Sequence, residues 1–239
     1  MSFENKRVGI IGTGASAIQA IPEIAKTADH LTVFQRTPNW AIPLHNAKIS
    51  KEEMAQIREG YPDLFKSCAE TRMGFVHDAN MDSIWDASDQ EREELWERLY
   101  AQPGFGMWLS NYKEMLIDHE ANKLVSDFVA KKIRERVHDQ DTAETLIPKN
   151  HGFGTRRVPM ETFYYEAYNR PNVRLVDLHR TPIETITETG LRTNDEQFEF
   201  DMLIYATGFD AVTGSFDAID FEGVNGAKLF HQWAEGPKT

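Results

Sequence analysis

The sequence predicts an α/β fold built on a parallel sheet, with a mainly helical insertion and a small antiparallel meander. Within residues 7–37, a short apolar strand, a glycine-rich turn, a helix and a second apolar strand follow one another. Residues 50–140 are charged, aromatic and periodic at helical spacing. Alternating strand patterns return after Pro171. These observations together predict a sheet whose strands come from both ends of the chain.

The first strand, residues 8–11, runs into a turn that reads Gly-Thr-Gly-Ala-Ser-Ala. Gly12 permits the tight turn, and Gly14 has no Cβ, so the backbone can approach a pyrophosphate closely. Ala17 replaces the third glycine of the usual pattern and still lets the helix pack near the strand. The helix beginning around Ala15 would direct its unpaired N–H groups at phosphates. The pattern indicates a Rossmann-like dinucleotide-binding unit, although a glycine-rich turn for another ligand is the alternative.

The second strand, residues 31–34, leads to Arg36. A cofactor with a free ribose hydroxyl would favour Asp or Glu at this point, whereas a guanidinium binds a 2′-phosphate through two parallel bonds. Thr37 could add a hydroxyl to the same phosphate. The sequence therefore predicts NADP(H) rather than NAD(H); the alternative is a solvated basic residue at a strand end.

The middle of the chain carries the signals of helices. Ser50 with Glu53, and Ser88 with Glu91, fit the capping box that begins a helix. Apolar residues repeat at helical spacing and are interpreted as core, at Ala121, Leu124, Val125, Phe128, Val129 and Ile133.

The later strands are predicted at residues 183–187, 190–193 and 197–200, as a meander, and in a buried strand from Met202 that ends in Ala-Thr-Gly. We therefore expect a nucleotide-binding domain at 1–46 and 146–208, a helical insertion at 47–145 and a return segment at 209–239.

Composition narrows the function classes. The 239 residues include 38 acidic and 26 basic side chains, and the net charge of −12 argues against nucleic-acid partners and anionic membrane surfaces. The single cysteine, Cys68, excludes an internal disulfide and a Cys-x-x-Cys pair. No apolar run reaches the length of a membrane span, and no signal-peptide core is present. We expect a soluble cytoplasmic protein without a metal site.

A basic loop, His151 to Arg157, precedes the later strands and reads His-Gly-Phe-Gly-Thr-Arg-Arg. Its two glycines suggest a mobile loop. Adjacent side chains of an extended loop point in opposite directions, so one arginine could bind the cofactor phosphate while its neighbour faces a reaction centre. A solvated basic loop is the alternative interpretation.

Four motifs together resemble those of the Baeyer–Villiger monooxygenases, especially the phenylacetone and cyclohexanone monooxygenase-like enzymes. They are Gly-Thr-Gly-x-Ser with Val-Phe-Gln-Arg-Thr-Pro-Asn, Phe-Gly-Thr-Arg-Arg, Tyr-Tyr-Glu-x-x-Asn-Arg-Pro-Asn-Val, and Tyr-Ala-Thr-Gly-Phe-Asp-Ala. They occur in family order across almost the whole chain. The resemblance implies a Rossmann-like NADPH-binding domain of the two-dinucleotide-binding flavoprotein type.

The resemblance also implies the chemistry. Such enzymes use NADPH to reduce bound FAD, and the reduced flavin uses O2 to convert a ketone substrate into an ester or lactone. The resemblance implies that the pyrophosphate region is contacted by Thr13, Gly14, Ala15, Ser16, Ala17 and Gln19. Gly12 belongs to the same cofactor-binding motif as the residue of the tight turn.

The other implied roles fall on three short segments. Arg36, Thr37 and Arg156 would hold the 2′-phosphate, with Arg156 at a position where the family usually has lysine. Arg157 would approach the flavin as the catalytic residue and stabilise the anion that forms there with oxygen. The remaining residues match the linker near the nicotinamide, namely Ala206, Thr207 and Gly208.

The family also carries an FAD-binding domain with its own glycine motif, and this chain has no second such motif. We therefore expect the NADPH-binding and helical portion of a monooxygenase, a fragment whose partner is the missing FAD domain and which is inactive alone. Two alternatives stay open. One is a portion of an N- or S-oxidising flavin-containing monooxygenase, and the other is a stand-alone, non-enzymatic NADPH-binding module.

Overall fold

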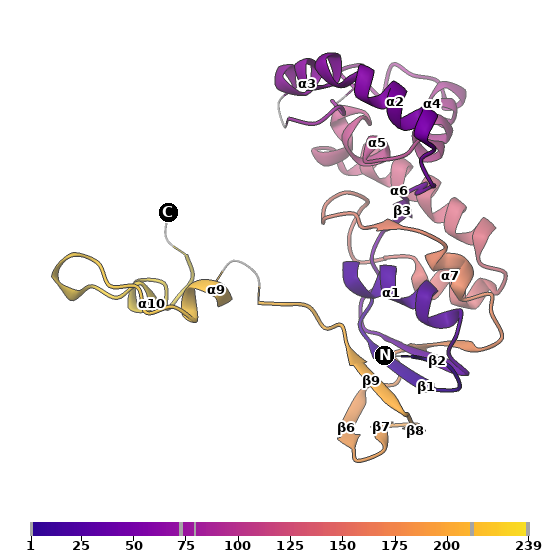
Figure 1. The fold of residues 1–239 in the computed structure, drawn as a ribbon, viewed down its shortest axis with the longest axis vertical. Helices are drawn as coiled ribbons and strands as arrows, with labels where there is room; N and C mark the ends of the chain where they lie inside the picture. Colours follow the sequence, from indigo (N-terminus) through magenta and orange to yellow (C-terminus); the bar gives the residue numbers. More distant parts are fainter. Residues whose placement is uncertain (1, 72–73, 79, 211–212, 238–239) are drawn as a thin grey trace. The chain divides into compact units, whose positions relative to one another are not determined.

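The computed structural model describes residues 2–71, 74–78, 80–210 and 213–237. The chain divides into two compact units, Met1–Ala206 and Thr207–Thr239. The first unit contains a four-stranded sheet in the order β5-β2-β1-β9, and every neighbouring pair is parallel (Figure 1). Its strands are β1 (Arg7–Ile11), β2 (His30–Gln35), β5 (Val173–Asp177) and β9 (Met202–Tyr205). The predicted parallel α/β fold is confirmed.

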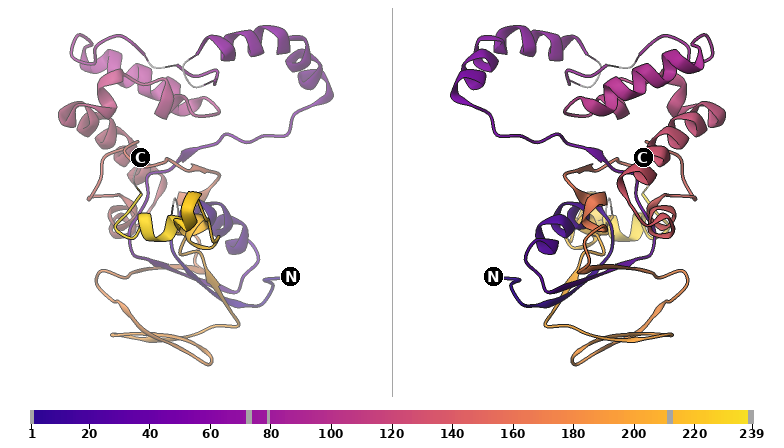
Figure 2. Two further views of the ribbon diagram at one scale, coloured as in Figure 1. Left: turned by 90° about the vertical axis from the view of Figure 1, so that its left-hand side faces the viewer. Right: turned by 90° about the vertical axis from the view of Figure 1, so that its right-hand side faces the viewer.

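Different elements cover the two faces of this sheet. Helix α1 (Ala15–Ala25) packs on the face that presents Val8 and Ile10. The predicted meander, confirmed as β6 (Ile183–Thr187), β7 (Gly190–Thr193) and β8 (Gln197–Glu199), lies on the opposite side (Figures 1 and 2). There the Phe34 ring meets the Phe198 ring edge-on, with centroids 5.1 Å apart. Successive side chains of each strand point to opposite faces of the sheet, so the two faces contribute to two separate hydrophobic clusters.

Helices fill the region between β3 and β4, as the periodicity predicts. They are α2 (Lys51–Glu59), α3 (Tyr61–Glu70), α4 (Asp89–Ala101), α5 (Gly106–Leu109), the 3₁₀ turn η1 (Lys113–Leu116), α6 (His119–Arg136) and α7 (Gln140–Leu146). Both capping boxes are present, at Ser50 and Ser88. Five of the six residues of the apolar stripe on α6 are buried, with Leu124 half-buried, which confirms them as core. By contrast, α2 and α3 bury none of their residues.

The helical region is joined to the sheet region by a small sheet and a buried ion-pair network. Strand β3 (Ile42–Pro43) pairs in parallel with β4 (Met160–Glu161), and the short helix α8 (Tyr164–Ala167) follows. At the end of α6, Arg136 donates to Glu161 at 2.8 Å and to Glu166 at 2.7 Å. The Glu161 side chain is completely buried. The network fixes the last turn of α6 to both β4 and α8.

The second unit contains α9 (Gly214–Asp217), the 3₁₀ turn η2 (Val224–Gly226) and α10 (Leu229–Gln232). Phe216 contacts the rings of Phe221 and Trp233, with centroids 5.8 and 5.2 Å apart. Residues 211–212 and 238–239 of the expected return segment, and residues 72–73 and 79 of the expected insertion, lie outside the described residues. Among the residues that the structure describes, no helix is long and apolar enough to cross a membrane.

Candidate functional site

The glycine-rich turn connects β1 to α1 at the carboxyl edge of the sheet. Gly12 has φ of 107°, a conformation that favours glycine, and its N–H donates to the Phe34 carbonyl at 2.8 Å. Gly14 is the N-cap of α1, and a Cβ built on it would meet nothing within 4 Å. Among the described residues, no side chain caps α1, and its first turn contains no acidic residue. No described side chain therefore competes with an anion for the first N–H groups of α1.

The turn is fastened to the residues that follow β2. The Thr13 hydroxyl donates to the Thr37 carbonyl at 3.1 Å, and Thr13 is only 4% exposed. This bond places the first turn of α1, with the predicted contacts Ala15, Ser16 and Ala17, close to the segment Arg36–Thr37. Arg36 is exposed, and no carboxylate among the described residues pairs with it. The structure thus brings the first turn of α1 and the segment Arg36–Thr37 to one edge.

The remaining predicted cofactor residues divide between the two units. Ala206 lies beside the turn, because its N–H donates to the Ile11 carbonyl at 2.9 Å. Thr207 and Gly208 belong to the second unit. Gln19 is exposed on α1, about one helical turn after Ser16. The cofactor roles of all these residues remain predictions.

The loop that precedes Arg156 is held on several sides. The Asn122 amide donates to the Phe153 carbonyl at 2.8 Å, and the Phe153 N–H donates to the Ser126 hydroxyl at 2.9 Å. Trp40 donates to the His151 carbonyl at 3.0 Å. A Cβ on Gly152 would collide with the Asn122 amide. The glycine expected to give mobility therefore allows a close approach between the loop and α6.

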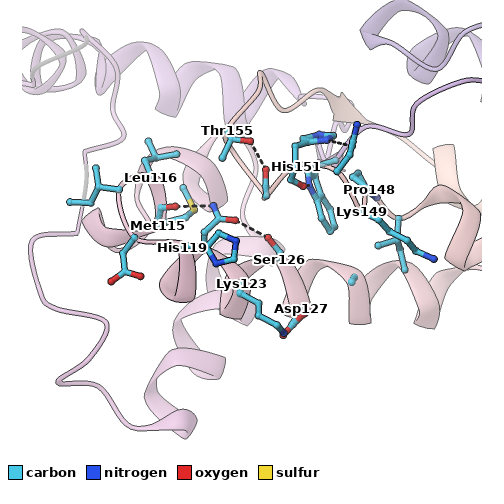
Figure 3. A pocket seen from close by; sticks show the side chains of 18 of the residues that line it. Met115, Leu116, His119, Lys123, Ser126, Asp127, Pro148, Lys149, His151 and Thr155 are labelled. Atoms are coloured by element: carbon cyan, nitrogen blue, oxygen red, sulfur yellow. Dashed lines mark hydrogen bonds and ion pairs between the residues drawn. The ribbon is translucent and has the colours of Figure 1, made fainter.

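A cavity of about 640 Å³ opens between this loop and α6 (Figure 3). Two of its cations are already paired, Lys123 with Asp127 at 2.5 Å and Lys149 with Glu144 at 3.4 Å. His151 lines the cavity, and the pKa of its ring is lowered by burial and, second, by the positive charge of Arg156. These surroundings favour a neutral His151 ring.

Arg156 and Arg157 are exposed beyond the anchored part of the loop. Within the described parts of the chain, neither guanidinium pairs with a carboxylate. The chain then runs beside the segment that follows Arg36, since the Ile42 N–H donates to the Pro159 carbonyl at 3.2 Å. The structure therefore brings the basic loop alongside this segment, and leaves both arginines available to a ligand.

A second cavity, of about 370 Å³, opens directly beside Thr37. Gln35 lines it and is 1% exposed. Its Nε2 donates to the Thr145 carbonyl at 2.7 Å, whereas no described residue donates to its buried Oε1. The sequence interpretation missed Gln35. The available signal was a polar residue that directly follows the apolar pair Val33–Phe34 and directly precedes Arg36.

Comparisons with known proteins cover the whole chain. It is 51% identical over 239 residues to 2-oxo-Δ3-4,5,5-trimethylcyclopentenylacetyl-CoA monooxygenase from Pseudomonas putida, of which it spans 44%. It is 39% identical to cyclopentanone 1,2-monooxygenase from Comamonas sp., again over 100% of the chain and 44% of the relative. A crystal structure of OTEMO with FAD and NADP matches at 51% identity with a TM-score of 0.96, covering 100% of this chain and 44% of that one.

Two further relatives are less similar. A Baeyer–Villiger monooxygenase from Pseudooceanicola batsensis is 34% identical over 99% of the chain and 44% of the relative. Phenazine N-monooxygenase PhzNO1 from Lysobacter antibioticus is 33% identical over 100% of the chain and 44% of the relative. No protein-family model matches the chain. By sequence and by fold, the chain is therefore similar to one region of Baeyer–Villiger monooxygenases, and it spans less than half the length of these relatives.

Proposed function

We propose that the chain binds NADPH, as the NADPH-binding region of a flavin-dependent Baeyer–Villiger monooxygenase that converts ketones into esters or lactones with FAD and O2. The observation that carries the proposal is the Thr13–Thr37 hydrogen bond of 3.1 Å. It joins the start of α1, which no described side chain caps, to Thr37, the neighbour of Arg36, which pairs with no described carboxylate. Both lie at the carboxyl edge of a parallel sheet, where dinucleotides bind in open α/β folds.

Each group at this edge fits one part of the cofactor. The first N–H groups of α1, from Ala15 to Ala17, would donate to the pyrophosphate, with Gln19 one turn further along. Arg36, Thr37 and Arg156 would hold the 2′-phosphate. A planar guanidinium suits this role, because it donates two parallel bonds to phosphate oxygens and keeps its charge at every physiological pH.

Arg157 would be the catalytic residue of the whole enzyme. Bound FAD would supply the redox chemistry that activates O2. A guanidinium aimed at the flavin stabilises negative charge that develops there, and it does not lose its proton in doing so. Ala206, Thr207 and Gly208 would carry the chain from the nicotinamide end of this site towards the FAD domain.

The NADPH assignment is tested by titrating the chain with NADPH and with NADH. We expect Arg36→Ala to weaken NADPH binding by one to two decades in Kd, through loss of charged bonds worth about 1.5–3 kcal/mol, and to leave NADH binding little changed. Arg58→Ala, at an exposed arginine of α2, is the matched control and should change neither affinity. Equal losses for the two cofactors would refute the 2′-phosphate role.

The oxygenation assignment needs a longer protein. This chain can replace the 51% identical region of OTEMO, and the product can be assayed with FAD, NADPH and a cyclic ketone. We expect ester or lactone formation, and its loss in the Arg157→Ala version while NADPH binding persists. Continued oxygenation by the variant would remove the catalytic role of Arg157.

An N-oxidising activity is the second candidate, favoured by the 33% identity to a phenazine N-monooxygenase. The same chimaera separates the two. A ketone turned over faster than a nitrogen heteroaromatic supports the first proposal, and the opposite preference supports N-oxidation.

We also propose a cytoplasmic location. The single cysteine, Cys68, is a free thiol, which suits a reducing compartment. Fractionation of the source cells followed by immunoblotting checks this, and recovery of the protein outside the cytoplasm would contradict it.

A further inference from the structure

We propose that Asn122, on helix α6, is a positioning residue for Arg156, so that the helical insertion fixes the place of the basic loop in the cofactor site. The inference rests on the proposed NADPH site, in which Arg156 holds the 2′-phosphate. It goes beyond that site, because it gives a role in cofactor binding to a residue of the insertion that is not expected to contact the cofactor.

Asn122 and Ser126 together bind both backbone groups of Phe153, in the middle of the loop. Nδ2 of Asn122 donates to the Phe153 carbonyl at 2.8 Å, and the Phe153 N–H donates to the Ser126 hydroxyl at 2.9 Å. The Ser126 hydroxyl donates in turn to Oδ1 of Asn122 at 3.1 Å, which closes a ring of hydrogen bonds. Nδ2 of Asn122 also donates to the Met115 carbonyl at 2.8 Å. Because Phe153 is fully buried and Asn122 is 8% exposed, little water competes for these bonds.

The anchored residue belongs to a turn that ends immediately before Arg156. The Thr155 hydroxyl donates to the Gly152 carbonyl at 2.9 Å, and the Thr155 N–H donates to the same carbonyl at 3.4 Å. Gly154 has φ of 77°, which favours glycine, and its carbonyl accepts from the Trp108 indole N–H at 3.2 Å. The turn is therefore closed by its own hydrogen bonds and held to the insertion by others.

Arg156 and Arg157 lie between two anchored points. The turn is on one side, and on the other Val158 is 1% exposed and is followed by the Pro159 carbonyl, which accepts from the Ile42 N–H at 3.2 Å. Consecutive Cα atoms are about 3.8 Å apart, so the backbone of Arg156 is held close to both anchors. A guanidinium on so restrained a backbone loses less conformational entropy when it binds a phosphate. Release of the turn would therefore weaken the phosphate contact without removing the arginine.

Limited proteolysis tests the anchoring by itself. Trypsin cleaves after arginine where the backbone opens locally, and its rate then follows the population of the open loop. Asn122→Leu removes the donors at similar side-chain size, so we expect cleavage after Arg156 and Arg157, located by mass spectrometry, to become about tenfold faster. Cleavage after the exposed Arg58, on α2, should not change. Ser126→Ala removes only one acceptor from the ring, so it should give about a threefold increase.

The milder variant keeps the test decisive. Unchanged cleavage after Arg156 in Asn122→Leu would overturn the inference. If Asn122→Leu does not fold, the same outcome in Ser126→Ala would overturn it.

A matched control is Asn169→Leu, at a half-buried asparagine beside the other end of α6. The Asn169 amide donates to the Arg136 carbonyl at 2.7 Å and accepts from the His138 N–H at 2.8 Å, and neither contact involves the basic loop. Its loss should leave cleavage after Arg156 unchanged. An equal increase in the variants of Asn169 and Asn122 would contradict the positioning role.

Cofactor titration tests the consequence for binding. The preference for NADPH over NADH is a ratio of two Kd values in one protein, so a change in the folded fraction does not alter it. We expect Asn122→Leu to lower this preference roughly two- to tenfold, and Asn169→Leu to leave it unchanged. In the Arg156→Ala background, Asn122→Leu should have no further effect, because the residue that it positions is gone.

The same titrations separate this inference from the proposed function. If Arg156→Ala lowers the preference and Asn122→Leu does not, the inference fails and the phosphate role of Arg156 stands. A further loss in the double variant would also overturn the inference, because Asn122 would then act through another group. No effect of Arg156→Ala would overturn both the phosphate role of this residue and the inference, while the test at Arg36 decides the rest of the NADPH site.

Discussion

Four helices of the insertion and helix α1 begin in opposite ways. Helices α2, α4, α6 and α7 each start at a residue whose side chain accepts a backbone N–H, namely Ser50, Ser88, Asp118 and Asp139. Helix α1 starts at Gly14, which has no side chain to accept one. The same chain therefore satisfies helix starts where it needs stability. Among the described residues, no side chain caps α1, α3 or α5, and of these three starts the one at α1 follows the glycine-rich turn.

Charged side chains divide in the same way. In the insertion, Lys131 bonds Glu93 at 2.6 Å and Lys132 bonds Glu97 at 2.5 Å. At the nucleotide edge, Arg36, Arg156 and Arg157 have no carboxylate partner in the described parts of the chain. Exposed arginines of the insertion such as Arg58 and Arg98 also have no carboxylate partner in the described parts of the chain, so the unpaired arginines support the nucleotide edge only together with their place beside the glycine-rich turn.

We expect the largest loss of stability when a paired, buried charge next to the insertion loses its partner. Arg136→Met leaves the fully buried Glu161 without its partner, so we expect a loss of about 3–5 kcal/mol in the free energy of unfolding. Urea denaturation measures it. Arg134→Met is the matched control on the same helix, because its pair with Glu144 is exposed and should contribute about 1 kcal/mol or less. Similar losses for the two variants would contradict the importance of the buried network.

We also expect the stability effect of Arg136→Met to depend on pH. Burial raises the pKa of Glu166, but hydrogen bonds and the charge of Arg136 lower it more, so the net pKa lies below the ordinary 4.5. A carboxylate with a depressed folded pKa stabilises the protein above the unfolded pKa, and this stabilisation is lost as pH falls through the folded pKa. The stability difference between the parent and Arg136→Met should therefore shrink below about pH 4.5. Denaturation midpoints at pH 7 and pH 4 check this, and a constant difference would refute it.

Removing one cap gives an intermediate effect. Ser88→Ala deletes the acceptor for the Glu91 N–H at the start of α4 and should cost about 1 kcal/mol of stability. NADPH affinity should not change, because this cap serves the insertion alone. A drop in affinity that exceeds the drop in stability would break the proposed division between the two regions.

Adding a cap to α1 gives the smallest change in stability and the sharpest test. The Cβ of Gly14→Ser would point into open space, and its hydroxyl could accept an N–H of α1. We expect a gain of a few tenths, about 0.3 kcal/mol, in unfolding free energy and weaker NADPH binding. Gly14→Ala adds the Cβ without the acceptor and is the control. Equal NADPH affinities for the two variants would show that the free donors of α1 are not used by the ligand.

Local signals made much of the fold predictable. The capping boxes at Ser50 and Ser88 and the conformation of Gly12 follow from residues within one turn, and the structure confirms them. Pairings between distant residues carried no such signal. The ion pair between Arg136 and Glu161 depends on the β3–β4 sheet, which positions Glu161. Each of these strands has two residues, which is too short to show a periodic pattern in the sequence.

The site was predictable in the same unequal measure. The glycine-rich turn and Arg36 could be predicted from the sequence, because each belongs to a motif of consecutive residues. The sequence interpretation missed Gln35, whose free acceptor exists only because Thr145, from α7, occupies the other end of the amide. Gly152 was interpreted through the freedom of a glycine alone, and its role as a close contact depends on Asn122 across the fold.

The interrupted sheet has a consequence for folding order. Strands β1 and β2 come from residues 7–35, whereas β5 and β9 come from residues 173–205. A ribosome therefore releases the whole helical insertion before either outer strand exists, and the local contacts of helices form faster than such distant strand pairs. The glycine turn appears first in the chain, yet its surroundings are completed last, when β9 pairs with β1.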